Sequence, residues 1–286
     1  MVDGFKAEMA RLGYVEGSTV EYVYEGPVTN QPDRLEAAAA ALLNAQVDLV
    51  FAITTPAANV AQQTFAGTDV PVVFWVIADP VEAGYVATMQ RPGGNMTGVT
   101  IGVEGFASEG RLEWLKQIAP DIQQVYLPYN PDDSLAVEQG LQVVQEVASS
   151  LGIELLLHQV RNRDEAAASA ATIPDEADAI CLLYADRTVM SARQSFIENA
   201  TQRRLPLSMF RSENAEEGAL VSFGTKHFPI GEQAARMAGQ IFRGVPAAEL
   251  PVEIPEFYLS IHLRTAEAIG LEIPDSLIRQ ADFVIR

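Results

Sequence analysis

Short runs of β-branched and apolar residues alternate with alanine-rich segments of helical length. In the first part of the chain, strands are expected at 19–24, 47–53 and 70–77, with helices at 31–45 and 56–65. Strands separated by single helices are typical of βαβ units, whose parallel sheet is covered on both faces. The pattern therefore predicts an α/β fold.

The alternation restarts after a cluster of turn-forming residues at 91–95 (RPGGN). Here strands are expected at 124–128, 153–160, 179–184 and 207–210, and helices at 111–118, 134–151, 164–172 and 189–202. Two such series, with an extended segment at 98–103 between them, predict two Rossmann-like lobes with parallel sheets.

The chain opens on an amphipathic helix, expected at 5–12, that no strand precedes. Because a parallel α/β lobe ordinarily opens with a strand, the first strand of this lobe is expected to be missing. Residues 1–6 contain neither a basic run nor an apolar core, so no secretory signal is expected within the sequence.

The net charge and the cysteine count exclude several kinds of binding partner and metal site. The 19 basic and 38 acidic side chains give a net charge of −19, and no basic run is longer than Arg203-Arg204. Nucleic acids and anionic membrane surfaces are therefore not expected as partners. A single cysteine, Cys181, rules out an intrachain disulfide and a cysteine-based zinc or iron–sulfur site.

Sequence signatures of catalysis are absent. The histidines His158, His227 and His262 show no metal-ligand spacing, and no G-x-S-x-G elbow, Walker phosphate loop or G-x-G-x-x-G motif occurs. Neither an enzyme nor a metal or cofactor is expected.

Polar residues follow the expected strands, where parallel sheets bind ligands. Thr54 and Thr55 stand at a helix start with Pro56. Their hydroxyls and the positive end of the helix could hold a carboxylate, or one of them could simply cap the helix. Asp79 follows the strand expected at 70–77. It could accept hydrogen bonds from a ligand ammonium, or it could cap a helix that begins at Pro80.

Polar and aromatic residues also follow the strands expected in the second lobe. Asn130 is expected to face ligand because Ser134 is the expected cap, whereas Asp186 could bind ligand or cap a helix. Arg211 could grip a carboxylate through two parallel N–H bonds, or lie solvated on the surface. The aromatic rings of Tyr184 and Phe210 could stack on a flat ligand or pack at the sheet rim.

Nine short motifs, taken in order, resemble one family of solute-binding proteins. They are 12–17 (LGYVEG), 32–35 (PDRL), 55–58 (TPAA), 79–81 (DPV), 91–98 (RPGGNMTG), 250–253 (LPVE), 263–266 (LRTA), 271–274 (LEIP) and 281–285 (ADFVI). The chain resembles, over essentially its whole length, the ABC-transporter substrate-binding proteins of the tryptophan/tyrosine-binding type, which have the type I periplasmic-binding-protein fold.

This resemblance implies two lobes, 1–103 with 227–255 and 104–226 with 256–286, joined by three crossings near 98–104, 224–228 and 255–260. A ligand would lie in the cleft between them. The resemblance makes Thr54, Thr55, Asp79, Asn130, Asp186 and Arg211 candidate ligand-binding residues, and Tyr184 and Phe210 beside them are expected to flank the ligand's side chain.

The resemblance further implies a periplasmic or extracellular, membrane-associated monomer. It would close on a small carboxylate-bearing ligand, an amino acid or aromatic acid, and deliver it to an ABC permease. A ligand-sensing domain with the same fold, and a small α/β enzyme, are the alternatives. The sequence departs from the family at the missing first strand, at the export signal, at His262 in place of asparagine and at Phe223 in place of tyrosine.

Overall fold

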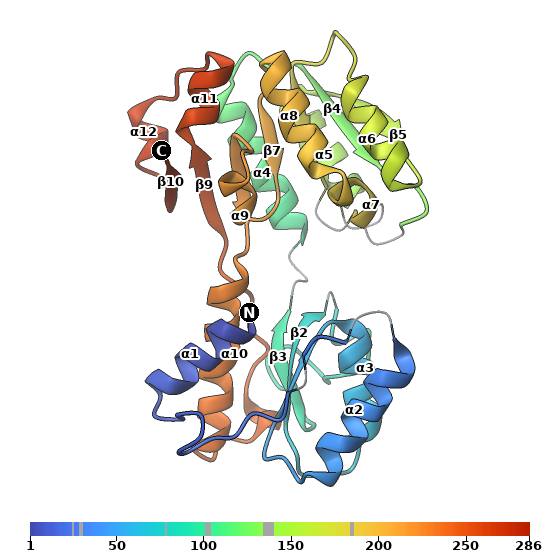
Figure 1. Cartoon of the computed structure of the whole chain (residues 1–286), viewed down its shortest axis with the longest axis vertical. Coiled ribbons are helices and arrows are strands. Elements are labelled where there is room, and N and C mark those ends of the chain that lie inside the picture. The colour runs from blue at the N-terminus through green and yellow to red at the C-terminus, as the bar shows by residue number, and fades with distance from the viewer. Residues whose placement is uncertain (25, 29–30, 78, 101–103, 134–139, 184–185) are drawn as a thin grey trace. The chain divides into compact units, whose positions relative to one another are not determined.

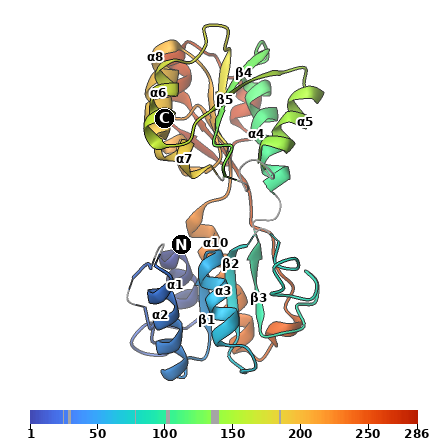
Figure 2. The same cartoon turned by 90° about the vertical axis from the view of Figure 1, so that its right-hand side faces the viewer.

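The computed structural model describes residues 1–24, 26–28, 31–77, 79–100, 104–133, 140–183 and 186–286. The chain forms two compact units, each with its own sheet (Figures 1 and 2). Unit 1 comprises Met1–Val103 and His227–Glu256, and unit 2 comprises Glu104–Lys226 and Phe257–Arg286.

Unit 1 contains a parallel sheet with the order β1-β2-β3. Its strands are β1 (Val50–Ile53), β2 (Val72–Ile77) and β3 (Met96–Thr100), and its helices are α1 (Val2–Arg11), α2 (Pro32–Asn44), α3 (Thr55–Thr64), α10 (His227–Phe242) and the 3₁₀ helix η2 (Ala247–Glu249). Along β2, Phe74 packs in the cluster containing residues of α3, whereas Val73 packs with α1 and α10. Both faces of the sheet are therefore covered, which explains why its strands read as continuous apolar runs.

Unit 2 contains a seven-stranded sheet with the order β10-β9-β8-β7-β6-β4-β5. Its strands are β4 (Gln124–Tyr129), β5 (Glu154–Gln159), β6 (Ala179–Cys181), β7 (Leu207–Met209), β8 (Val221–Gly224), β9 (Tyr258–His262) and β10 (Phe283–Ile285). Its helices are α4 (Glu104–Ile118), α5 (Gln142–Ser150), α6 (Arg163–Ala171), α7 (Arg187–Ser191), α8 (Arg193–Arg203), α9 (Glu213–Glu216), α11 (Leu263–Ile269) and α12 (Asp275–Ile278). Only the β8–β9 pairing is antiparallel among these strands.

The predicted α/β class with parallel-dominated sheets is confirmed, and most expected elements are present. The expected helix 189–202 begins earlier and is interrupted, because Ala192 separates α7 from α8. Of the expected helix 134–151, residues 142–150 form α5, whereas 134–139 lie outside the described residues.

The prediction of a strand at 19–24 is wrong. This segment has one isolated bridge, between Glu16 and Val20, and joins no sheet. An apolar alternating segment becomes a strand only beside a backbone edge that pairs with it. Here β1, whose hydrogen-bonded neighbour is β2, faces the segment across a groove.

His262, which the sequence comparison expected to be asparagine, has a structural role that asparagine could also fill. It is the N-cap of α11, and its Nδ1 accepts a hydrogen bond of 3.0 Å from the backbone N–H of Thr265. Asparagine is a preferred N-cap because its side-chain oxygen accepts this same bond. Burial lowers the pKa of His262 below its ordinary 6.5, which keeps the ring in its accepting, neutral form.

We expect His262→Asn to retain the cap and remove its pH dependence. The neutral ring contributes stability above pH 6.5, and this is lost as the pH falls through the lowered pKa of the folded protein. Urea denaturation should show the wild type losing unfolding free energy relative to His262→Asn between pH 7 and pH 5, whereas His262→Ala should cost about 1 kcal/mol at pH 7. A difference between wild type and His262→Asn that is constant with pH would contradict this role.

Candidate functional site

In unit 1, Thr54 makes a sharp turn from β1 into α3. Its φ of 95° lies where a β-branched residue is rarely found. The turn is held on both sides, since the Thr54 N–H donates to Trp75 O at 3.1 Å and its carbonyl accepts from Ala58 N–H at 2.9 Å. The exposed Thr54 side chain makes no capping hydrogen bond. Simple helix capping by Thr54 is therefore not its role in this structure.

The N-terminus of α3 forms an exposed, electropositive surface. Thr55 and Pro56 are exposed, and the first turn carries no acidic residue that would neutralise the helix dipole. Backbone N–H groups of the first helical turn point outward beyond the carboxyl end of β1. A carboxylate is the kind of group that such a helix start stabilises.

Asp79, after β2, holds the following turn and keeps one oxygen exposed. Its Oδ1 accepts the N–H groups of Val81 and Glu82, both at 2.9 Å. No helix lies between Asp79 and β3 among the described residues, so the alternative that Asp79 caps a helix is wrong, and Asp79 stabilises a turn instead. Oδ2 makes no hydrogen bond within the described part of the chain, so the exposed carboxylate retains capacity for a cation.

In unit 2, Asp186 ties two strand ends together. Its Oδ1 accepts from Val189 N–H at 2.9 Å as the N-cap of α7, and its Oδ2 accepts from Asn130 N–H, after β4, at 2.5 Å. Asp186 is fully buried. Burial raises the pKa of its carboxyl above 3.8, an effect opposed by these backbone hydrogen bonds and strengthened by nearby Asp133. The capping alternative is observed here, and contact with ligand stays a prediction.

Asn130 belongs to the same network. Its Nδ2 donates to Thr188 Oγ1 at 2.9 Å, and its Oδ1 accepts from Asp132 N–H at 3.0 Å. The side chain is thus more engaged than expected. The predicted cap at Ser134, from which its availability was inferred, lies outside the described residues, as does the candidate Tyr184.

Arg211 follows β7 on a backbone that Asn214 holds in place. The Asn214 side-chain oxygen accepts from Arg211 N–H at 3.0 Å, and Asn214 N–H donates to Arg211 O at 2.8 Å. Among described residues the half-buried guanidinium has no ion-pair partner within 4.0 Å. Its charge does reach Glu217, whose pKa is lowered first by a hydrogen bond from Arg193 and further by Arg211.

Phe210 is buried, and its ring packs against a residue that sequence reasoning missed. The Arg111 guanidinium lies 5.2 Å from the Phe210 ring centroid and donates to Leu182 O at 3.2 Å. Arg111 is only 1% exposed, although it shares a helix face with the buried Leu115 and Ile118. An arginine at a core-facing helical position is the signal that could have revealed it.

Trp75, near the end of β2, was also missed. It is buried, and its Nε1–H has no hydrogen-bond acceptor among the described residues. Its indole packs edge-on against the His227 ring at the start of α10, with 5.8 Å between ring centroids. Within a continuous apolar run, nothing in the sequence sets this residue apart.

Each unit therefore places polar and charged groups at the carboxyl ends of its parallel strands. The described residues contain no group of three or more His, Cys, Asp or Glu side chains that could hold a metal ion. They also contain no helix with the length and hydropathy needed to span a bilayer.

The sequence profile of the family described as ABC transporter substrate binding protein matches residues 1–285. A tyrosine-binding protein of Clostridioides difficile (strain R20291) is 22% identical over 272 residues, which are 94% of this chain and 76% of that protein.

Two solved structures share the fold. An ABC domain in complex with L-Trp from Streptococcus pneumonia has a TM-score of 0.78 at 23% identity, over 99% of this chain and 94% of that one. The second is the ligand-free, open structure of a substrate-binding protein with adhesive properties from Clostridium difficile. Its TM-score is 0.80 at 24% identity, and the match covers 99% of this chain and 93% of that one.

The fold is that of the type I periplasmic binding proteins, and the matching family consists of substrate-binding proteins and not of enzymes. This chain belongs to the family of ABC transporter substrate-binding proteins.

We expect Asp186→Ala to destabilise unit 2, because it leaves the N–H groups of Asn130 and Val189 without their acceptor. Losing the acceptor of buried donors costs about 1–3 kcal/mol. Urea denaturation can compare it with Asp132→Ala, since the Asp132 carboxylate is exposed and lies 3.4 Å from the Arg161 guanidinium. Equal unfolding free energies for the two variants would show that the Asp186 network contributes nothing to stability.

Proposed function

We propose that this protein is the solute receptor of an ABC importer and that it binds an aromatic amino acid. The observation that carries the proposal is the pair of anion-receptive features at strand ends: the exposed start of α3 in unit 1 and the guanidinium of Arg211 in unit 2. The tyrosine-binding relative and the neighbour in complex with L-Trp support the choice of ligand.

In this proposal the ligand carboxylate binds to Thr54, Thr55 and the first turn of α3, and Arg211 supplies the positive charge. A guanidinium can form two parallel, charge-assisted hydrogen bonds to a carboxylate. Asn214 keeps the backbone of Arg211 in position.

The ligand ammonium would be held by the exposed carboxylate of Asp79, whose Oδ1 is already occupied by two backbone N–H groups. Asp186 is buried, so we assign it the task of positioning Asn130. Tyr184 and Phe210 would flank the aromatic side chain, with Phe210 backed by the Arg111 guanidinium.

The two units would be the lobes of a monomeric receptor that closes around the ligand. The chain passes between units near residues 103, 226 and 256, and these passages would be the hinges. Closure would create the surface that a membrane permease recognises. The protein would act outside the cytoplasmic membrane, where such a permease receives its solute.

We expect calorimetry to detect binding of L-Trp or L-Tyr and no comparable binding of tryptamine or tyramine, which lack the carboxylate. Arg211→Ala should weaken the amino-acid affinity by about 10- to 150-fold, the equivalent of about 1.5–3 kcal/mol for a hydrogen bond to a charged group. Arg163→Ala removes an exposed arginine at the start of α6 and serves as the matched control.

Thr55→Ala tests unit 1 separately and should also weaken binding. Tight binding of the amines, or an unchanged affinity in Arg211→Ala, would contradict the assigned carboxylate site.

A further inference from the structure

Carboxylates lie close to Arg211 in the sequence. Glu213 and Glu216 begin and end α9, and Glu217 follows it directly. A glutamate that paired with the Arg211 guanidinium would occupy the N–H groups that a ligand carboxylate needs. Yet Arg211 has no ion-pair partner within 4.0 Å in the part of the chain that the structure describes. The other contacts of these carboxylates therefore decide whether Arg211 is available to a ligand.

Glu217 is held by Arg193, the first residue of α8. Arg193 Nε donates to Glu217 Oε2 at 2.8 Å, and Arg193 Nη2 donates to Glu217 Oε1 at 3.1 Å. This two-pronged geometry engages both carboxylate oxygens and fixes the orientation of the carboxylate. The Arg193 guanidinium is itself anchored, because its Nη1 donates to Met190 O in α7 at 3.3 Å.

Asn214 joins Glu217 to the backbone of Arg211. Its Nδ2 donates to Glu217 Oε2 at 3.1 Å, and its Oδ1 accepts from Arg211 N–H at 3.0 Å. Asn214 is 2% exposed, so its amide is fixed between the two residues. The Glu217 carboxylate thus lies beside the loop that carries Arg211. Its pKa is lowered first by the hydrogen bond from Arg193 and also by the charge of Arg211.

We propose that Arg193 is a positioning residue of the ligand site, because its ion pair with Glu217 keeps that carboxylate from the Arg211 guanidinium. The inference rests on the proposed function, in which Arg211 binds the ligand carboxylate. Arg193 does not touch the ligand in this mechanism. Without Arg193, Glu217 would pair with Arg211 and compete with the ligand from within the protein.

The competition is between similar partners, because Glu217 and an amino-acid ligand each offer a carboxylate. The side chains of Arg193 and Glu217 are 39% and 35% exposed, so solvent screens their attraction. A pair between Glu217 and Arg211 would also be screened, and it would engage part of the Arg211 population. Since a ligand binds only the unpaired part, its apparent affinity falls in proportion to that fraction.

Calorimetry with L-Trp or L-Tyr tests the competition. Arg193→Ala should weaken binding about three- to sixfold, the effect of an exposed ion pair that competes for Arg211. Adding Glu217→Gln to Arg193→Ala should restore the affinity to within about twofold of the wild type, because the competing charge is gone. If the ion pair merely held α9 in place, it would stay broken in the double variant, which would bind as weakly as Arg193→Ala.

Two control variants match these changes in charge. Glu198→Gln removes another exposed carboxylate from α8, and it should not restore binding to Arg193→Ala. Arg11→Ala breaks an ion pair with Glu232 in unit 1, where the two side chains lie 2.7 Å apart, and it should leave the affinity unchanged.

A second measurement needs no ligand and so separates this inference from the proposed function. The carboxyl pKa of Glu217 can be followed by ¹³C NMR in the ligand-free protein. Arg211→Ala should raise this pKa more in the Arg193→Ala background than in the wild type, because Arg211 becomes the partner of Glu217 once Arg193 is removed. If the wild type binds no aromatic amino acid, the proposed function is wrong, and this comparison still decides whether Arg193 keeps Glu217 from Arg211.

Three results would overturn the proposal. One is an equal rise of the Glu217 pKa on Arg211→Ala in both backgrounds. The others are an Arg193→Ala variant that binds as tightly as the wild type, and a double variant with Glu217→Gln that binds as weakly as Arg193→Ala.

Discussion

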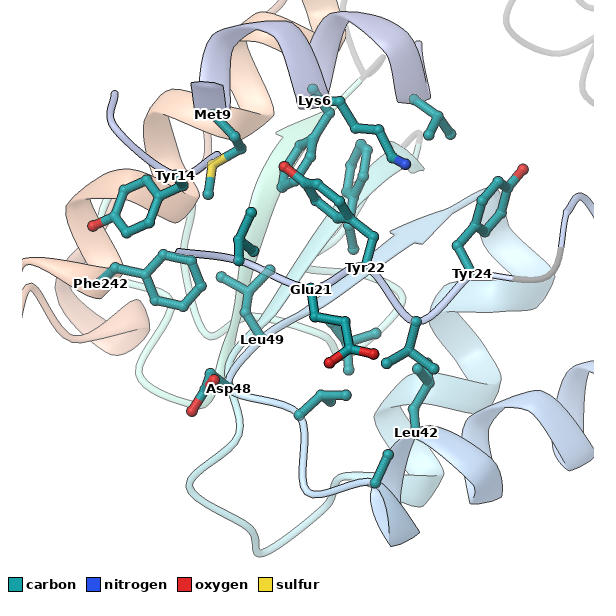
Figure 3. Close-up of a pocket in the computed structure, with 18 of the residues that line it drawn as sticks. Lys6, Met9, Tyr14, Glu21, Tyr22, Tyr24, Leu42, Asp48, Leu49 and Phe242 are labelled. Carbon is teal, nitrogen blue, oxygen red and sulfur yellow. The ribbon is translucent and has the colours of Figure 1, made fainter. Parts of the chain in front are cut away.

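Parallel pairing of strands is the constraint on which the rest of this structure depends. Because β1, β2 and β3 run in one direction, their carboxyl ends meet at one edge of unit 1, and β4, β6 and β7 do the same in unit 2. Loops that are distant in sequence are thereby brought to one edge of each sheet. The same pairing leaves β1 at the edge of its sheet, where it lines a pocket together with segment 19–24 (Figure 3).

The polar residues at these edges divide into those that hold the loops and those that remain exposed. Asp186 and Asn130 use their polar atoms within the protein, and the burial of Asp186 makes this network a fixed part of unit 2. Thr54, Thr55 and Asp79 are exposed in unit 1, and Arg211 is half-buried in unit 2. Loops that internal hydrogen bonds hold in place before ligand arrives need less ordering when they bind it, which lowers the free-energy cost of binding.

The sequence predicts the fold class and most elements because each buried strand and helix carries its own periodicity. The sequence wrongly predicts a strand at 19–24, because a strand forms only beside another strand that pairs with it, and the local sequence does not specify that neighbour. The break at Ala192 likewise has no Gly or Pro to mark it. For the site, strand ends identify the loops, but the sequence does not show that Asp186 is a buried helix cap whereas Asp79 is exposed and stabilises a turn. That difference, like the burial of Arg111, arises from tertiary packing.

The most direct test of the proposed receptor role is an amide NMR titration of the protein with L-Trp and L-Tyr. The account predicts that the largest shift changes occur in both units at once, at Thr55 and Ala57 after β1 and at Arg211 and Asn214 after β7. Changes confined to the pocket of unit 1 that Tyr22 and Phe51 line, or the absence of any change at saturating amino acid, would contradict it.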